Sequence, residues 1–200
     1  MPADADIDNA RQLTGPALID LSPGLARLAR PGCKLDFGAI GKGYALDRAG
    51  ALLEKRGLVR ALLNFGGQLL ALDAPPGEAG WRVEVRDPAK PEATLATVRL
   101  SRASISTTAD YERGLVIGER RMSHIVDPRT GRPVEGMLGV TVVCPTATEA
   151  DALSTALFVL RGQDGSRYCA DHSTRALIVP AQGPPLFTDG FRALEVALVH

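Results

Sequence analysis

Cysteine is scarce in this sequence, and its scarcity excludes two common ways of building a small protein. The 3 cysteines, Cys33, Cys144 and Cys169, are widely spaced, odd in number and outside any C-x-x-C pair. The sequence therefore predicts neither a disulfide framework nor a zinc site. Cys144 ends an apolar run, where a small buried thiol is the simplest interpretation.

An excess of charge of either sign is also missing. Lysine plus arginine and aspartate plus glutamate each number 23, so the formal net charge is +0. A balanced chain lacks the long-range field that nucleic-acid-binding and membrane-surface proteins use. We therefore expect no nucleic-acid partner.

Long hydrophobic runs are absent as well. No apolar run approaches the ~18 residues that a membrane-spanning helix needs, so we expect no membrane span. The start of the chain, MPADADIDNARQ, is acidic and lacks the basic and apolar regions of a signal peptide. We predict a loose lead-in over residues 1–12.

The remaining composition is that of an ordinary globular protein. Hydrophobic residues make up 45% of the 200 residues, enough for one domain over residues 1–200. Apolar residues at helical spacing predict helices over Tyr44–Arg56 and Glu149–Leu160. Strands are predicted over Ala17–Ile19, Lys34–Phe37, Ala61–Phe65, Gln68–Leu72, Trp81–Arg86, Leu95–Leu100, Ser104–Thr108, Gly114–Ile117, Arg121–Val126, Gly139–Cys144, Ala176–Val179 and Phe191–Leu198. Many strands with few helices predict an α+β fold with mixed or antiparallel sheets.

A glycine-rich turn lies directly before the first predicted helix. Gly38, Gly41 and Gly43 let the backbone approach another group closely, and the helix that follows directs the positive end of its dipole at the same spot. Asp36 and Lys42 add one charge of each sign. This pattern favours a phosphate or nucleotide site. The alternative is an ordinary strand-to-helix turn, because the spacing is not G-x-G-x-x-G.

The second predicted helix carries three oxygen-bearing side chains on one face. Ser154 and Thr155 follow Asp151 by three and four residues, so both lie about one turn from it on the same face. A carboxylate with two hydroxyls suits Mg²⁺ or Ca²⁺ better than zinc. The alternative is that Asp151 caps its helix, since Thr146/Glu149 and Thr148/Asp151 both fit a capping box.

One histidine lies near a tight turn. His124 precedes the segment Asp127–Gly131, in which proline and glycine favour a turn. A histidine inside a strand that ends in a tight turn can act as a base near neutral pH, although a partly buried structural role is the alternative. His124 and Asp127 are three residues apart on a strand, so we expect them to face opposite sides. The sequence contains no nucleophile elbow, so it does not support a Ser-His-Asp hydrolase.

Five segments make the sequence recognisable. They occur in the order DFGAIGKGYALDR, LNFGG, ISTTADY, SHIVDPRTGRP and VTVVCPTATEADALSTALFVL, over residues 33–162. Together they closely resemble the FAD:protein FMN transferase (ApbE) family. The resemblance implies an ApbE-like, T-fold-like α+β domain.

The resemblance also implies two sets of site residues. The first set would contact FAD and is formed by Asp36, Lys42 and Val126. The second set would hold Mg²⁺ and is formed by the backbone oxygen of Ala39 with the side chains of Asp151, Ser154 and Thr155. The candidate for the group that takes the proton of the attacking hydroxyl is His124.

The activity that the resemblance implies is protein flavinylation. FAD would be the substrate, Mg²⁺ the cofactor, and FMN would pass to a threonine or serine hydroxyl of an acceptor protein, with release of AMP. Two alternatives stay open. The first is a Mg²⁺-dependent FAD pyrophosphatase in which water replaces the hydroxyl, and the second is a non-catalytic or degenerate flavin-binding module.

The sequence departs from the family pattern in three places. The family carries a substantial N-terminal portion with further flavin contacts, so we expect this chain to be an N-terminally shortened form. Thr108-Ala109 replaces a common serine-glycine pair, and Gln68 follows NFGG where an acidic residue is usual. Family members usually act behind an export or lipoprotein signal, which suggests the periplasm or cell envelope.

Overall fold

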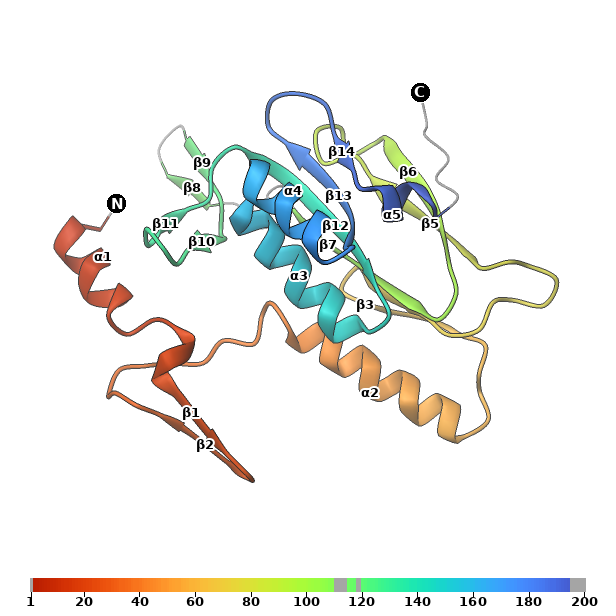
Figure 1. The fold of residues 1–200 in the computed structure, drawn as a ribbon, viewed down its shortest axis with the longest axis horizontal. Helices are drawn as coiled ribbons and strands as arrows, with labels where there is room; N and C mark the ends of the chain where they lie inside the picture. The colour runs from red at the N-terminus through yellow and green to blue at the C-terminus, as the bar shows by residue number, and fades with distance from the viewer. Residues whose placement is uncertain (1, 110–114, 118–119, 195–200) are drawn as a thin grey trace.

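The computed structural model describes residues 2–109, 115–117 and 120–194. The α+β class predicted from the sequence is confirmed (Figure 1). The helices are α1 (Asp4–Arg11), η1 (Pro16–Leu18, a 3₁₀ turn), α2 (Gly41–Lys55), α3 (Ala147–Leu160), α4 (Gly162–Asp171) and α5 (Asp189–Arg192). The strands are β1 (Ile19–Ser22), β2 (Leu25–Leu28), β3 (Leu62–Phe65), β4 (Gln68–Ala71), β5 (Trp81–Arg86), β6 (Thr94–Leu100), β7 (Ala103–Ala109), β8 (Leu115–Ile117), β9 (Arg120–Met122), β10 (Val126–Asp127), β11 (Arg132–Pro133), β12 (Met137–Cys144), β13 (Arg175–Pro180) and β14 (Leu186–Phe187).

A six-stranded sheet forms the centre of the protein. Its strand order is β14-β13-β12-β7-β4-β3, and every neighbouring pair is antiparallel. The long strand β12 lies in the middle and is almost wholly buried, as its β-branched, apolar sequence predicts. Its register sets Val142 opposite Ser106 of β7. After Cys144 the chain passes from the middle of the sheet into α3, which begins at Ala147.

The two faces of this sheet bury different sets of apolar side chains, because successive residues of a strand point to opposite faces. On one face, Val142 of β12 and Ile178 of β13 pack with Leu157 and Phe158 of α3. Figure 1 shows α3 lying across β12 and β7. On the other face, side chains of β12 and β13 pack with those of the β5–β6 hairpin. The sheet is thus enclosed between a helical layer and a second, two-stranded sheet.

The β3–β4 hairpin and α2 complete the helical side. Phe65 pairs with Gln68, so the chain reverses at Gly66 and Gly67, whose φ angles are 58° and 86°. Two consecutive residues with positive φ are what a two-residue type I′ hairpin turn requires, and glycine adopts them without strain. As a sequence pattern, the Gly66-Gly67 pair suggests a bulge in a continuing strand or a place where a ligand comes close, and the hairpin excludes the bulge. Leu46 of α2 packs against the hairpin in a third apolar cluster.

Both predicted helices are confirmed, and each begins earlier than its apolar pattern suggested. The side chain of Thr146 accepts a hydrogen bond from the backbone N–H of Glu149 at 3.3 Å, so the first capping box correctly marks the start of α3. Thr148 lies inside the helix, so the second capping box does not cap it. Asp151 therefore has no capping role, and its carboxylate needs another explanation.

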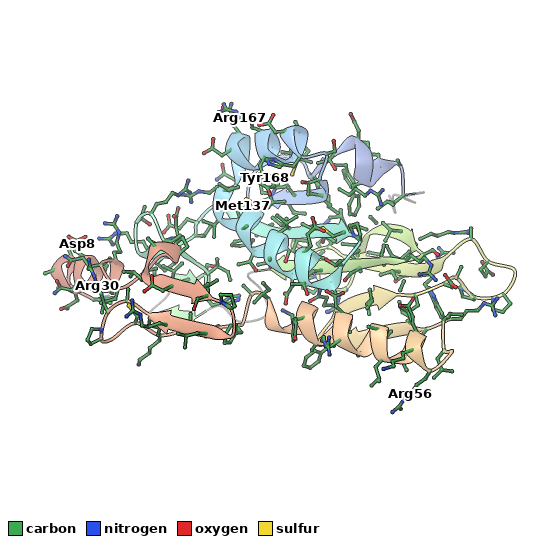
Figure 2. All side chains as sticks on the ribbon, turned by 60° about the horizontal axis from the view of Figure 1, so that its bottom comes forward. Asp8, Arg30, Arg56, Met137, Arg167 and Tyr168 are labelled. Carbon is green, nitrogen blue, oxygen red and sulfur yellow. The ribbon has the colours of Figure 1, made fainter. Side chains whose placement is uncertain are left out.

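The N-terminal segment differs from its prediction. Instead of a loose lead-in, residues 4–11 form α1, which lies with the β1–β2 hairpin at one end of the molecule (Figures 1 and 2). Asp8 and Arg30 lie at this end, whereas Arg56, after α2, points away from the body at the other side (Figure 2). The predicted strands over Ala17–Ile19 and Lys34–Phe37 are wrong, since only Ile19 lies in a strand.

The C-terminal part holds two further corrections. Residues 162–171 form α4, whose polar sequence did not suggest a helix. A four-residue helix, α5, occupies the start of the predicted final strand, and residues 195–198 of that strand lie outside the described part. The predicted hairpin is present as β8 paired with β9, while its Gly118-Glu119 turn and Gly114 lie outside the described residues. Among the helices described, none has the length and apolar character needed to cross a bilayer.

Candidate functional site

The start of α2 lies directly against the start of α3. A Cβ atom placed on Gly43 would lie 2.2 Å from the backbone oxygen of Ala147, so only glycine permits this approach. One turn further along α2, the Asp47 carboxylate accepts hydrogen bonds from the backbone N–H groups of Ala147 at 2.7 Å and Thr148 at 2.9 Å. A carboxylate here satisfies unpaired N–H groups and complements the helix dipole. The two helix starts are therefore held in one relative position.

The Asp151 carboxylate lies at this junction. Its side chain is 2% exposed, and its Oδ1 atom is 2.6 Å from the Nζ atom of Lys42. Its Oδ2 atom accepts a hydrogen bond from the backbone N–H of Gly43 at 3.0 Å. A buried carboxylate is tolerated when it has a charged partner and hydrogen bonds, and Asp151 has both. The glycine-rich turn and the oxygen-bearing helix face therefore meet, although they are more than a hundred residues apart.

The other two oxygens of the helix face belong to a chain of hydroxyls. Ser154 is fully buried, and its Oγ atom lies 2.9 Å from the hydroxyl oxygen of Thr108 and 3.3 Å from that of Ser106. The Thr108 hydroxyl also lies 3.1 Å from that of Thr155. Thr108 and Ser106 come from β7, and sequence reasoning assigned no role to either. The ISTTADY segment was the available signal, because alternate positions of a strand face the same way.

Asp36 and Ala39 belong to the glycine-rich turn itself. Asp36 is exposed, and its Oδ1 atom accepts a hydrogen bond from the backbone N–H of Gly38 at 2.6 Å. This contact is an Asx turn, which shapes the loop ahead of α2. The backbone oxygen of Gly38 in turn lies 3.5 Å from the Nζ atom of Lys42. Ala39 is the next residue of the same exposed turn.

His124 is not inside a strand, contrary to the prediction. Strand β9 ends at Met122 and β10 begins at Val126, so the histidine lies in the bend between them. Its side chain is half-buried, and its Nδ1 atom is buried without a hydrogen-bond partner among the described residues. A buried ring nitrogen without a partner is costly, so this atom is a candidate for contact with a ligand or substrate.

Val126 and Asp127 follow on β10 and play different parts. Val126 is 50% exposed and lines a cavity of about 370 Å³ that α1 also borders. Asp127 is buried and forms the predicted tight turn, in which its carboxylate accepts hydrogen bonds from the Arg129 guanidinium. These bonds lower the pKa of Asp127 to about 2, against the effect of burial. Among the described residues, no hydrogen bond joins Asp127 to His124, although His124 does not lie on the strand from which this was expected.

The residues at the α2–α3 junction fit a hard divalent cation. Carboxylate, hydroxyl and backbone oxygens are the donors that Mg²⁺ or Ca²⁺ accept. The junction offers the Asp151 carboxylate and the Gly38 backbone oxygen, and α3 carries the hydroxyls of Ser154 and Thr155 one turn beyond Asp151. The Lys42 ammonium already lies between the Gly38 carbonyl and the Asp151 carboxylate, which marks the spot as one that favours positive charge. Within the described part of the chain, no three His, Cys, Asp or Glu side chains come together as metal ligands would. Asp151 would thus be the charged ligand.

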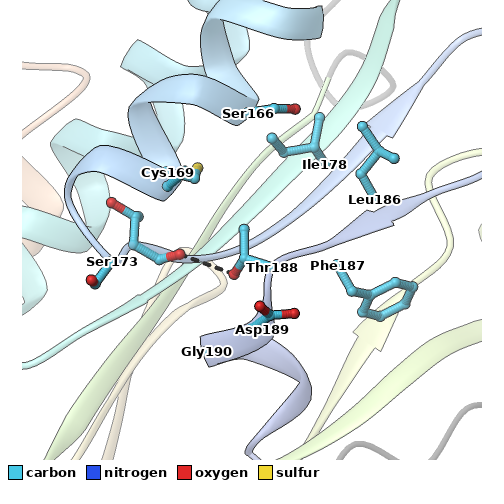
Figure 3. Close-up of a pocket in the computed structure, with 11 residues that line it drawn as sticks. Ser166, Cys169, Ser173, Ile178, Leu186, Phe187, Thr188, Asp189 and Gly190 are labelled. Atoms are coloured by element: carbon cyan, nitrogen blue, oxygen red, sulfur yellow. Dashed lines mark hydrogen bonds between the residues drawn. The ribbon is translucent and has the colours of Figure 1, made fainter.

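A separate cavity lies away from this junction. It has a volume of about 450 Å³ and is bordered by α4, β13, β14 and α5 (Figure 3). Ser166 and Cys169 line it from α4, and Thr188 and Asp189 from the start of α5. Burial raises the pKa of the Cys169 thiol. None of the residues predicted for the site lines this cavity, so the chemistry of the candidate site lies elsewhere.

Comparison with known proteins gives a consistent result. A family model described as the ApbE family matches residues 1–178. The FAD:protein FMN transferase of Salmonella typhimurium is 32% identical over 189 residues, which cover 92% of this chain and 54% of that protein. The FAD:protein FMN transferase of Escherichia coli K12 is 39% identical over 132 residues, which cover 65% of this chain and 38% of that protein. The chain therefore spans about half the length, or less, of these relatives.

Solved structures agree with the fold. The ApbE protein of Thermotoga maritima superposes with a TM-score of 0.90 at 32% identity, covering 98% of this chain and 64% of that one. The flavinyl transferase ApbE of Pseudomonas stutzeri, in its apo form, superposes with a TM-score of 0.85 at 31% identity, covering 97% of this chain and 61% of that one. On this evidence the chain belongs to the ApbE family.

Proposed function

We propose that this protein transfers FMN from FAD to a threonine or serine hydroxyl of an acceptor protein, with Mg²⁺ as cofactor and release of AMP. The observation that carries the proposal is the contact between Lys42 of the glycine-rich turn and Asp151 of α3 at 2.6 Å. It supports the proposal because the buried Asp151 carboxylate lies beside the N-terminus of α2, where a diphosphate would find positive potential. The names of the relatives support a flavin transferase.

The residues of the junction divide into two roles. Asp151, Ser154, Thr155 and the backbone oxygen of Ala39 would hold Mg²⁺. A bound Mg²⁺ would neutralise the negative charge that develops on the phosphates as the bond to AMP breaks. Lys42 would contact the diphosphate as a point charge, and the exposed carboxylate of Asp36 would accept hydrogen bonds from the nucleotide. Val126, half exposed on β10, would offer the flavin nucleotide an apolar contact.

The transfer forms one bond and breaks another. The acceptor hydroxyl oxygen bonds to the phosphorus on the FMN side of FAD, and the bond from this phosphorus to AMP breaks. His124 would take the hydroxyl proton, since its buried Nδ1 atom has no hydrogen-bond partner among the residues described. The position of the reacting groups would supply much of the remaining rate enhancement.

The test combines three readouts on the same protein. FAD is titrated with and without Mg²⁺ while flavin fluorescence is followed, AMP release is quantified, and covalent flavin on a threonine-containing acceptor protein is detected after denaturing electrophoresis. We expect Mg²⁺-dependent AMP release with labelled acceptor, and its loss in Asp151→Ala. The matched control is Asp171→Ala, which removes an exposed aspartate at the end of α4.

The outcomes separate the candidate reactions. Free FMN and AMP without labelled acceptor would identify hydrolysis by water, and FAD binding without turnover would identify a binding module. Full activity of Asp151→Ala would remove the proposed ion from the mechanism. The resemblance also favours a periplasmic or cell-envelope location, which fractionation of the native cells would test.

A further inference from the structure

The Lys42 ammonium lies where the proposed metal ion would be expected. Its Nζ atom is 2.6 Å from Oδ1 of Asp151 and 3.5 Å from the backbone oxygen of Gly38. One of these oxygens comes from α3 and the other from the glycine-rich turn, the two elements that supply the proposed metal ligands. The lysine thus joins two oxygens that a divalent cation could bridge instead.

The environment of Asp151 explains why a cation is needed at this spot. The carboxylate is 2% exposed, and the Gly43 N–H group bonds only its Oδ2 atom. A buried charge that loses its single charged partner strongly destabilises the folded state. Among the described residues, the salt bridge recorded for Asp151 is the one with Lys42. Lys42 therefore stabilises the junction whenever Asp151 carries no metal ion.

Lys42 is also free to leave. Its side chain is 33% exposed, whereas that of Asp151 is almost fully buried, so the lysine has an open path to solvent. Its stem runs beside the β3–β4 turn, where a Cβ atom on Gly66 would lie 3.5 Å from the Lys42 Cδ atom. A side chain at position 66 would be in ordinary contact with the stem, and glycine has none. A four-carbon stem with an ammonium at its end can move away from Asp151 without any change in the backbone.

We propose, on the basis of the proposed function, that Lys42 is a built-in counter-cation that a divalent metal ion displaces from Asp151. The ammonium and the metal ion compete for the Oδ1 atom, because two cations at one carboxylate repel each other. Displacement turns the ammonium toward solvent, where it can bind the diphosphate of the incoming nucleotide. Metal binding and the readiness of Lys42 for FAD are therefore coupled.

The first test measures Mg²⁺ binding by calorimetry without FAD. We expect Mg²⁺ to bind Lys42→Met about tenfold more tightly than the unaltered protein, because the competing cation is gone and the buried carboxylate is left unpaired. The matched control is Lys55→Met, an exposed lysine at the other end of α2, for which we expect unchanged affinity. Unchanged or weaker binding to Lys42→Met would overturn the displacement.

Thermal unfolding checks the same variants without relying on affinity. We expect metal-free Lys42→Met to unfold at a lower temperature than the unaltered protein, and saturating Mg²⁺ to remove most of this difference. A difference that persists at saturating Mg²⁺ would mean that Lys42 stabilises the fold in another way. For Lys55→Met we expect neither a lower unfolding temperature without metal nor a recovery at saturating Mg²⁺.

A third measurement uses the unaltered protein, so it does not depend on the folding of a variant. The sequence has four lysines, Lys34, Lys42, Lys55 and Lys90, so their ammonium groups give a simple nitrogen-detected magnetic resonance spectrum. We expect the Lys42 ammonium signal to persist without metal and to shift or broaden as Mg²⁺ is added. An unchanged signal at metal saturation overturns the proposal. Absence of Mg²⁺ binding in every variant would refute both the displacement and the metal of the proposed function. Mg²⁺ binding with the same affinity in Lys42→Met and in the unaltered protein would refute the displacement alone.

Discussion

One oxygen of the Asp47 carboxylate accepts two hydrogen bonds from Thr148, from its backbone N–H at 2.9 Å and from its hydroxyl at 2.6 Å. Asp47 belongs to α2 and Thr148 to the first turn of α3. The contact is thus a helix cap supplied by a distant part of the chain, and it fixes the two helix starts that form the candidate site.

Loss of the cap should weaken both the fold and the site. We expect Asp47→Ala to lower the free energy of unfolding by about 1–2 kcal/mol, as for other lost caps with a favourable dipole contact. Denaturant unfolding measures this change, and Asp6→Ala, at an exposed aspartate of α1, is the control. Because the junction would loosen, Mg²⁺ affinity should fall in Asp47→Ala only. An unfolding free energy equal to that of the control would show that the cap does not hold α3.

The close contact between α2 and α3 predicts a large difference between two glycine substitutions. In Gly43→Ala, the new methyl group would meet backbone atoms of Ala147 at 2.2 and 2.5 Å, which cannot move aside cheaply. We expect a loss of about 3 kcal/mol or more, at the upper end of overpacking effects.

The matched control for this substitution is on the same helix. In Gly50→Ala, the new methyl group would meet the Cδ2 atom of Leu70 at 2.9 Å, and a side-chain end can shift. The gain in helix propensity, about 1 kcal/mol, offsets part of that strain. Denaturant unfolding of both variants gives the comparison. Equal losses of unfolding free energy would mean that the contact at Gly43 does not limit the approach of α2 to α3.

The hydroxyl chain beneath the site predicts a specific role for Thr108. Its hydroxyl contacts those of Ser154 and Thr155, so Thr108→Val should release two proposed ligands from a defined orientation. We expect a loss of about 1–2 kcal/mol in stability together with weaker Mg²⁺ binding.

The neighbouring residue provides the control for Thr108. Thr107 pairs with Thr141 at 2.9 Å on the opposite face of the sheet. Thr107→Val should therefore change stability by a similar amount and leave Mg²⁺ affinity unaltered. Calorimetric Mg²⁺ titration of both variants separates the effect on metal binding from the effect on stability. Equal Mg²⁺ affinities of the two variants would show that Thr108 does not orient the proposed ligands.

The Asp127–Arg129 pair predicts how stability depends on pH. The hydrogen bonds from Arg129 hold the pKa of Asp127 at about 2 in the folded protein, below the ordinary value of 3.8. A depressed pKa stabilises the folded state fully above about pH 3.8, and this stabilisation is lost as the pH falls toward 2. The difference in unfolding free energy between the unaltered protein and Asp127→Asn should therefore be constant near neutral pH and shrink below about pH 4. A difference that does not vary with pH would contradict this assignment.

Local chemistry was sufficient to predict several elements. The β-branched run at β12 and the helical spacing of α2 and α3 agree with the structure. In each of these elements the fold buries apolar residues that belong to the pattern. The polar helix α4 was missed, since its stability comes from packing a few residues such as Cys169 rather than from a visible apolar stripe. The Gly66-Gly67 turn was misread because a glycine pair fits both a bulge and a hairpin.

The sequence by itself determined the family, the α+β class and the residue types of the candidate site, because ordered motifs and hard-oxygen side chains are visible in one dimension. Only the tertiary structure decided that the Lys42 ammonium is paired with Asp151 and that Thr108 joins Ser154 to Thr155. These contacts depend on the antiparallel placement of β7 beside β12 and on the approach of α2 to α3 at Gly43. Such approaches are set by the packing of whole elements, which no local pattern encodes.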